Sequence, residues 1–150
     1  MKTIILLLVA ALTSSAAISQ IQNPVQWDFS AIKINATTYE VHLTATLSDG
    51  WHIYSQTTPE GGPVPTLISF TNNPLIAISG STKEKGKLEQ RHEELFGVDV
   101  KQYSGKVVFV QKLVLKGKVK TSLNGSIEFM TCNDRECLPP KSQKFSIAIQ

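Results

Sequence analysis

Apolar and polar residues alternate along most of the chain, which is the pattern of half-buried β-strands. The clearest case is YEVHLTATL, residues 39–47, in which every second side chain is apolar and after which Ser48-Asp49-Gly50 favours a turn. Shorter extended patterns follow in WHIYS, TLISF and LIAIS, and KFSIAI near the end alternates again. KVVFVQKLVL, residues 106–115, is almost continuously apolar, as expected of a central strand covered on both faces.

No segment shows an amphipathic helical pattern of more than a couple of turns. Roughly seven to nine short strands, punctuated by Gly, Pro and Asn, predict an all-β fold, an immunoglobulin-like antiparallel β-sandwich. Within SLNGSIEFM, the pair Asn124-Gly125 favours a tight hairpin or a bulge. The pattern contains no repeat and no second domain.

Two stretches break the alternation. SQTTPEGGPVP, residues 55–65, is a Pro/Gly loop that cannot be a central strand. LEQRHEELFGVDVKQYSG, residues 88–105, mixes charged residues with Leu95, Phe96 and Tyr103, and is expected to be irregular. Aromatic residues on a charged loop indicate a binding role, because loops carry function on rigid scaffolds. The alternative is that Phe96 folds back into the core.

The first residues have the pattern of a secretory signal peptide, with Lys2, an apolar run over residues 4–12 and small residues after it. This run is too short to span a bilayer, and no later segment approaches the ~20 apolar residues of a membrane helix. Cleavage after Ala17 or Ser19 fits, and we favour Ser19. The sequence therefore predicts a signal peptide over residues 1–19 and one exported, periplasmic domain over residues 20–150, without direct membrane insertion.

The formal net charge of +3 is too small to indicate a nucleic-acid partner or an anionic membrane surface. Lysines do cluster in KEKGK, residues 83–87, and in a second group from Lys112 to Lys120 that includes KGKVK. Both sequences contain glycine where a hairpin would turn, so both are predicted to be solvated turns whose lysines also block unwanted strand pairing.

Both cysteines, Cys132 and Cys137, lie in FMTCNDRECLPPK, and their spacing allows three interpretations. As a structural staple the pair would contribute little, because the loop-entropy expression gives only about 2 kcal/mol for so small a ring. As a metal site the two thiolates would supply half of a zinc tetrahedron, but the chain's histidines are not at ligand spacing. We therefore expect no metal and no cofactor.

The third interpretation is a redox-active pair. A disulfide in a small ring is easily strained, and strained or exposed disulfides are the ones that take part in exchange. Pro139-Pro140 removes two backbone donors and stiffens the chain after the second cysteine. An oxidising compartment makes the bond itself reasonable without saying what it does.

The cysteine segment FMTCNDRECLPP resembles that of the N-terminal periplasmic domain of the thiol:disulfide interchange protein DsbD. In that family an aromatic-rich strand leads to Cys, a short loop, Cys, one residue and Pro-Pro. DGWHIYS is similar to the family's Asp-Gly-aromatic-x-x-Tyr strand, and RHEELFG to its acidic-aromatic cap loop. The three motifs follow in the family's order and spacing, and the resemblance covers essentially the whole chain after the signal peptide.

The resemblance implies a sandwich whose cysteine pair receives electrons from a membrane-embedded carrier domain and passes them to thioredoxin-fold and other exported disulfide proteins. By position, Cys137 would form the mixed disulfide with the partner and Cys132 would resolve it. Tyr54 would lie beneath the pair. The cap loop would shield the cysteine pair with Leu95 or Phe96, beside the acidic Glu93 and Glu94. This loop is shorter than the family's, which leaves open which of the two side chains does the shielding.

Two functions therefore follow from the sequence. The first is an exported thiol-disulfide exchange module, an oxidoreductase component that relays electrons between a membrane reductase or thioredoxin-like donor and periplasmic disulfide proteins. The alternative is a non-enzymatic, immunoglobulin-like binding domain whose disulfide is structural. The family's domain is usually followed by a transmembrane carrier and a thioredoxin-like domain, so the relay would need a donor in another protein.

Overall fold

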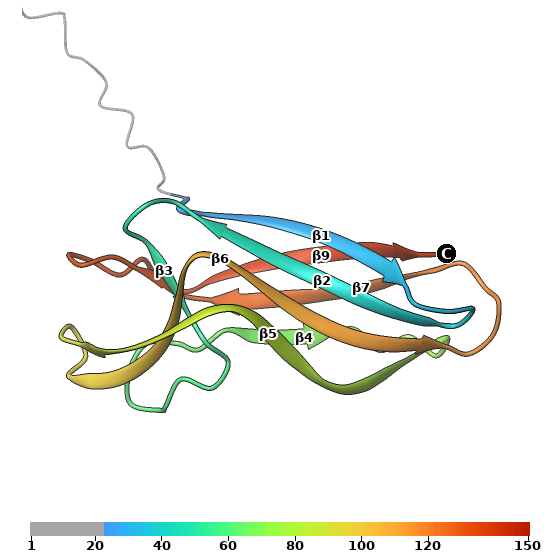
Figure 1. The fold of residues 1–150 in the computed structure, drawn as a ribbon, viewed down its shortest axis with the longest axis horizontal. Coiled ribbons are helices and arrows are strands. Elements are labelled where there is room, and N and C mark those ends of the chain that lie inside the picture. The colour runs from blue at the N-terminus through green and yellow to red at the C-terminus, as the bar shows by residue number, and fades with distance from the viewer. Residues whose placement is uncertain (1–22) are drawn as a thin grey trace, which may run out of the picture.

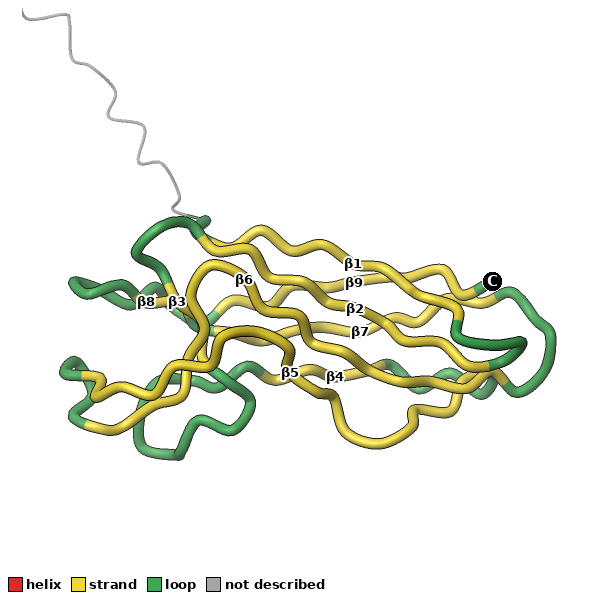
Figure 2. Tube along the Cα trace, in the orientation of Figure 1, coloured by secondary structure: helices red, strands yellow, loops and turns green. Residues whose placement is uncertain are grey.

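The computed structural model describes residues 23–150, and the signal peptide predicted for residues 1–19 lies outside them. The described part of the chain is all strand and loop (Figures 1 and 2). Its strands are β1 (Val25–Lys33), β2 (Thr38–Leu47), β3 (His52–Tyr54), β4 (Leu67–Phe70), β5 (Ile76–Glu93), β6 (Val98–Leu115), β7 (Thr121–Phe129), β8 (Thr131–Cys132) and β9 (Lys141–Ile149). Within residues 23–150 there is consequently no helix that could cross a membrane.

The strands form two antiparallel sheets. The larger has the order β1-β2-β6-β3-β8, with β5 paired to the other edge of β6. The smaller has the order β4-β7-β9. β6 is the central strand, because β2 and β3 share one of its edges and β5 runs along the other. The predicted all-β sandwich is confirmed, and its apolar central strand has the position that its sequence indicated.

The main core lies between the two sheets. The alternating side chains of β2 point into it and are almost completely buried, as the pattern in residues 39–47 predicts. They meet apolar side chains of β6, β7 and β9 in one continuous cluster. Burying each large aliphatic or aromatic side chain contributes about 1.5–3 kcal/mol, so this cluster is the main source of stability.

Three local predictions were wrong. KEKGK lies inside β5, whose pairing with β6 shifts register between Gly86 and Leu88, so the glycine marks an irregularity and not a turn. Residues 88–105 are mostly strand and form the turn end of a long β5–β6 hairpin instead of an irregular loop. Asn124-Gly125 lies in the middle of β7. A side chain at Gly125 would meet the Phe145 ring and a backbone oxygen of β4, so glycine is needed here for packing.

The Pro/Gly loop after β3 is held against β5 by one carboxylate. Glu84 accepts hydrogen bonds from Ser55 Oγ at 2.7 Å and from the Gln56 backbone nitrogen at 2.7 Å. The hydroxyl of Tyr103 donates to the same carboxylate at 2.8 Å. These bonds are charge-assisted and therefore stronger than neutral ones. They fix the loop beside the end of the sandwich that carries the cysteines.

Candidate functional site

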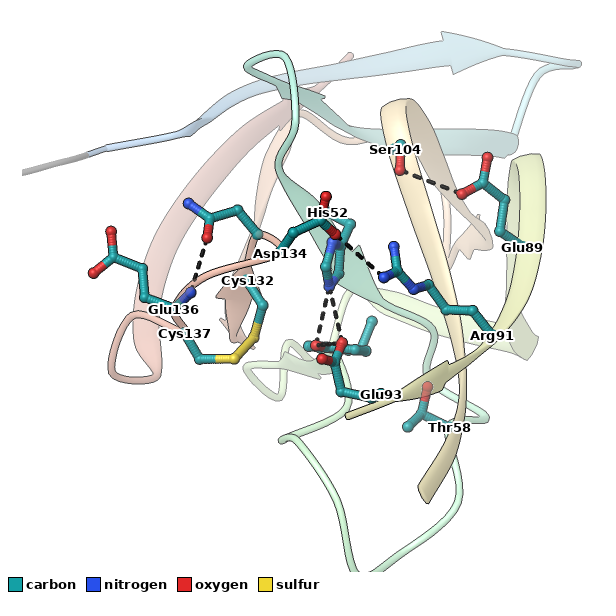
Figure 3. Close-up of polar contacts among 12 residues, drawn as sticks. His52, Thr58, Glu89, Arg91, Glu93, Ser104, Cys132, Asp134, Glu136 and Cys137 are labelled. Carbon is teal, nitrogen blue, oxygen red and sulfur yellow. Dashed lines mark hydrogen bonds and ion pairs between the residues drawn. A yellow bond between two sulfur atoms is a disulfide. The ribbon is translucent and has the colours of Figure 1, made fainter. Parts of the chain in front are cut away.

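Cys132 and Cys137 form a disulfide at one end of the sandwich (Figure 3). The chain doubles back between them, because the Asn133 nitrogen donates to the Glu136 carbonyl at 2.9 Å and Leu138 nitrogen to the Thr131 carbonyl at 2.9 Å. The Asn133 side chain caps the turn by accepting from two backbone nitrogens, at 2.8 and 2.9 Å. The sequence NDRE therefore makes a local turn that closes the small ring.

The two sulfur-bearing residues differ in exposure. Cys132, in β8, has no solvent-exposed surface, whereas Cys137 is half-buried. Tyr54 and Val100 form a small apolar cluster with Cys132. Val98, Met130 and Cys137 pack against its outer side. An incoming thiolate therefore reaches Cys137 more easily than Cys132.

A buried polar triad lies beside the disulfide. His52 is the register partner of Cys132 across β3 and β8, so the two side chains are on the same face of the sheet. His52 Nε2 is 3.1 Å from the Tyr54 hydroxyl, which donates to Glu93 Oε2 at 2.9 Å. His52 Nε2 is also 3.4 Å from that oxygen. The three side chains come from β3 and from the end of β5, and all are buried. Figure 3 labels His52 and Glu93 beside the disulfide.

Burial shifts the pKa values of His52 and Tyr54. Desolvation lowers the pKa of His52 below its ordinary 6.5, although the neighbouring Glu93 carboxylate opposes the shift. Desolvation and the hydrogen bond to Glu93 raise the pKa of the Tyr54 hydroxyl. The Tyr54 hydroxyl donates its one proton to Glu93, so its oxygen is left to accept, and a neutral His52 with its proton on Nε2 donates to it.

The lowered pKa of His52 predicts a loss of stability in mild acid. Below about pH 6.5 the unfolded chain binds a proton at this histidine and the folded chain does not, so unfolding becomes easier as the pH falls. The slope from this one group is at most about 1.4 kcal/mol per pH unit. An ordinary histidine titrates between roughly pH 7.5 and pH 5.5. Denaturant unfolding of the wild type over this range should show the free energy of unfolding falling as the pH falls.

The His52→Gln variant should lose that part of the slope. His92→Gln is the matched control, because the His92 ring is 59% exposed and meets solvent in the folded chain too. Equal slopes in the wild type and in His52→Gln would contradict the assignment.

The predicted cap loop is the turn of the β5–β6 hairpin. The carbonyl of Glu93 accepts from the backbone nitrogens of Phe96 and Gly97 at 3.1 and 2.8 Å. The Glu93 side chain points inward to Tyr54, whereas Glu94 is exposed. Leu95 is 54% exposed and Phe96 36% exposed. The cap is therefore anchored through a buried carboxylate and carries two apolar side chains at its surface.

The Pro/Gly loop packs against the cap hairpin. A Cβ atom at Gly62 would lie 2.6 Å from Cγ2 of Val98 and 4.0 Å from Cβ of Phe96. Only glycine permits this close approach. The two irregular stretches of the sequence thus meet at the site, and Val98 packs against the disulfide cluster. Which of Leu95 and Phe96 shields the cysteines stays a prediction.

A second tie joins the cap hairpin to the cysteine loop. Arg91 Nη2 is 3.2 Å from Asp134 Oδ1, and both side chains are largely exposed. An exposed pair contributes little to stability, with a median of about 0–1 kcal/mol. This ion pair nevertheless joins the cap hairpin directly to the turn that closes the disulfide ring (Figure 3).

Sequence reasoning did not name His52 or the apolar residues Val98, Val100 and Met130 as part of the site. The signal for His52 was its position two residues before Tyr54, since alternate residues of a strand share a face. Val98 has the same relation to Val100. Among residues 23–150, no group of three or more His, Cys, Asp and Glu side chains is placed to hold a metal ion.

The family described as thiol:disulfide interchange protein DsbD, N-terminal, matches residues 19–149. The chain belongs to the DsbD N-terminal domain family. The family's chemistry is thiol-disulfide exchange, and the disulfide between Cys132 and Cys137 provides the group that such chemistry needs. A search of curated protein sequences finds no match to the chain.

Solved structures of other proteins share the fold of this chain. The N-terminal periplasmic domain of ScsB from Proteus mirabilis matches with a TM-score of 0.60 and 22% identity over 85% of the chain. The chain spans 47% of that structure's length. The DsbD N-terminal domain of Neisseria meningitidis in the reduced form matches with a TM-score of 0.54 and 14% identity, covering 83% of this chain and 85% of that one.

A third structure contains a partner. It is the complex between the DsbD N-terminal and PilB N-terminal domains of Neisseria meningitidis. The match has a TM-score of 0.55 and 14% identity, and covers 85% of this chain and 87% of that one. At these identities the likenesses establish the immunoglobulin-like fold of the family.

Proposed function

We propose that the chain is an exported thiol-disulfide exchange module that cycles between a Cys132–Cys137 disulfide and a dithiol. The observation that carries this proposal is the asymmetry of the pair, with a half-buried Cys137 bonded to a fully buried Cys132 at an end of the sandwich. One sulfur is available to a partner, and the other is held behind it. Exchange proceeds through attack on one sulfur and release of the other, so this arrangement supports an exchange role.

Reduction of the module would proceed in two exchange steps. A donor thiolate attacks Sγ of Cys137, forming the donor–Cys137 disulfide and releasing Cys132 as a thiolate that then takes a proton. The donor's second thiolate then attacks the donor's first sulfur, which is bonded to Cys137 in the mixed disulfide, and releases Cys137 as a thiolate. Two electrons enter the module, and the donor leaves as a disulfide.

Delivery would reverse the order. The Cys137 thiolate attacks a recipient disulfide, and Cys132 then attacks Sγ of Cys137 and frees the recipient as a dithiol. Thioredoxin-fold proteins are the proposed recipients or donors, and a membrane electron-carrier domain is a further donor. The complex of a DsbD N-terminal domain with the PilB N-terminal domain supports partner docking in this family.

The cap turn would regulate access to Cys137. Glu93, Glu94, Leu95 and Phe96 form the tip, and the buried Glu93 side chain holds it against β3. Docking of a partner would displace the tip and replace its apolar contacts. Cleavage after Ser19 and release into the periplasm are proposed on the signal-peptide pattern, and the related ScsB structure is a periplasmic domain.

The reduction potential of the pair separates exchange from a structural role. Equilibration of the purified protein with thioredoxin of known redox state should give a value near the thioredoxin range of about −270 mV. A value well below about −300 mV would indicate an inert bond and favour the alternative, a binding domain with a structural disulfide. Mass spectrometry after rapid alkylation measures the oxidised fraction at each step.

A further inference from the structure

The end of the sandwich opposite the disulfide is formed by three loops and the last residue (Figure 1). The β1–β2 loop is tied to the end of β6 by the Leu115 nitrogen, which donates to the Thr37 carbonyl at 2.8 Å. The β4–β5 loop is tied to the β6–β7 loop by the Lys116 nitrogen, which donates to the Leu75 carbonyl at 2.9 Å. We call this surface, residues 31–38, 71–78, 115–121 and 147–150, the lysine end.

Four lysines gather on the lysine end, and all are exposed: Lys33, Lys116, Lys118 and Lys120. None of the four segments contains an Asp or a Glu. The four positive charges of these lysines exceed the single negative charge that a terminal carboxylate on Gln150 would add. Lys33, Lys118 and Lys120 line a shared hollow of about 290 Å³, so the fold brings lysines from separate loops together.

Exposed aliphatic side chains accompany these lysines. Ile32, near the end of β1, and Ile34, in the loop after it, are 45% and 52% exposed, and Ile78, near the start of β5, is 41% exposed. Leu75 and Val119, on the other two loops, are each 38% exposed. Single exposed aliphatic residues are ordinary on protein surfaces. Here five of them lie on the loops and strand ends that also carry the lysines, which is the composition of surfaces that bind the interface of an anionic bilayer.

The charge is also polarised along the molecule. At the other end, the cap hairpin (residues 88–105) and the cysteine loop (residues 132–141) carry a small excess of acidic residues. The six acidic residues are Glu89, Glu93, Glu94, Asp99, Asp134 and Glu136, and the four basic residues are Arg91, Lys101, Arg135 and Lys141. Near a negative surface this distribution turns the lysine end toward the surface and the disulfide end away from it.

We propose that the lysine end docks on anionic phospholipid at a membrane surface, without inserting a span. The proposal is independent of the proposed exchange function. The small net charge is a sum over the whole chain and does not describe any one surface. The fold concentrates positive charge at the lysine end, so this end can bind an anionic membrane surface even though the net charge is small. Docked in this way, the protein presents Cys137 to thioredoxin-fold partners on the side away from the bilayer, and a membrane electron-carrier domain would reduce it in the undocked state.

Vesicle binding tests the proposal. The protein is purified after export, so that the apolar run of residues 4–12 does not itself bind lipid. It should sediment with vesicles of phosphatidylglycerol and phosphatidylcholine in a one-to-two ratio, and not with phosphatidylcholine alone. Binding should weaken as salt is added, because screening shortens the reach of the lysine charges.

Two charge-matched double variants locate the surface. Lys118→Glu with Lys120→Glu should weaken binding at least about 30-fold, since each lysine near an anionic surface contributes about five-fold in affinity. Lys83→Glu with Lys85→Glu, on exposed β5 positions outside the lysine end, makes the same change in net charge and should leave most of the binding. Ile34→Ser with Val119→Ser should weaken binding without a change in charge.

Equal losses in the two charge variants would mean that total charge, not the lysine end, decides binding. That result would overturn the proposal, as would an absence of binding to the anionic vesicles at low salt. Circular dichroism of each variant checks that the sandwich is intact. The exchange activity of the cysteine pair is measured on the same preparations, so that failure of one proposal can be told from failure of the other.

Discussion

Replacing Glu93 with alanine is expected to lower the free energy of unfolding by about 2 kcal/mol, because a buried donor left without its acceptor costs about 1–3 kcal/mol. Glu93 is 4% exposed and accepts from the Tyr54 hydroxyl at 2.9 Å. Its loss also removes the carboxylate near His52 and the buried anchor of the cap turn. The same variant should therefore open the cap and speed reduction of the disulfide by a small dithiol about tenfold or more.

Glu94→Ala is the matched control for this prediction. Glu94 is the next residue, carries the same charge and is exposed, so its loss should change stability by no more than about 0.5 kcal/mol. Glu93→Gln should lie between the two, since its amide oxygen can still accept from Tyr54. Denaturant unfolding and the rate of reduction by dithiothreitol measure both effects. Equal behaviour of Glu93→Ala and Glu94→Ala would show that the buried anchor does not hold the cap.

In the reduced protein, Cys137 is expected to react with iodoacetamide at least about 30-fold faster than Cys132. This ratio corresponds to a local opening free energy of about 2 kcal/mol for the buried thiol. Cys132 has no exposed surface and Cys137 is half-buried. Peptide mapping by mass spectrometry gives the two rates from one sample.

The same reaction in denaturant provides the control, because unfolding removes the difference in burial and leaves only the intrinsic reactivity of each thiol. The two rates should then be similar. Because the cap is proposed to cover Cys137, Glu93→Ala should speed the reaction of Cys137 in the folded protein and so widen the ratio. Similar rates for the two thiols in the native wild type would contradict the roles assigned to them.

The fold was predictable because burial follows strand periodicity closely. The alternate residues of β2 are buried as their pattern requires, and the apolar run of β6 is the centre of the larger sheet. The β5–β6 hairpin was not predicted, since its outer edge faces solvent and its residues are correspondingly charged. A strand of that kind has no alternating apolar pattern to identify it. Gly125 was misassigned because its small size serves packing across the sheet.

The candidate site was predictable where a motif carries it and not where distant residues meet. Cys132, Cys137 and Tyr54 were named from the sequence, and the structure places all three in one cluster. The partnership of Glu93 with His52 was missed, because it joins residues 41 positions apart whose contact depends on the pairing of β3 and β6. The lysine end was missed for the same reason, since its charges come from separate loops.

The central claim is that Cys137 is the sulfur that exchanges with a partner, and trapping tests it most directly. Cys132→Ala in its reduced form, mixed with an exported thioredoxin-fold protein in its disulfide form, should accumulate a mixed disulfide through Cys137, because no thiol remains in the module to resolve it. Cys137→Ala is the matched variant and should form little adduct. Equal adducts from both variants, or none from Cys132→Ala, would contradict the account.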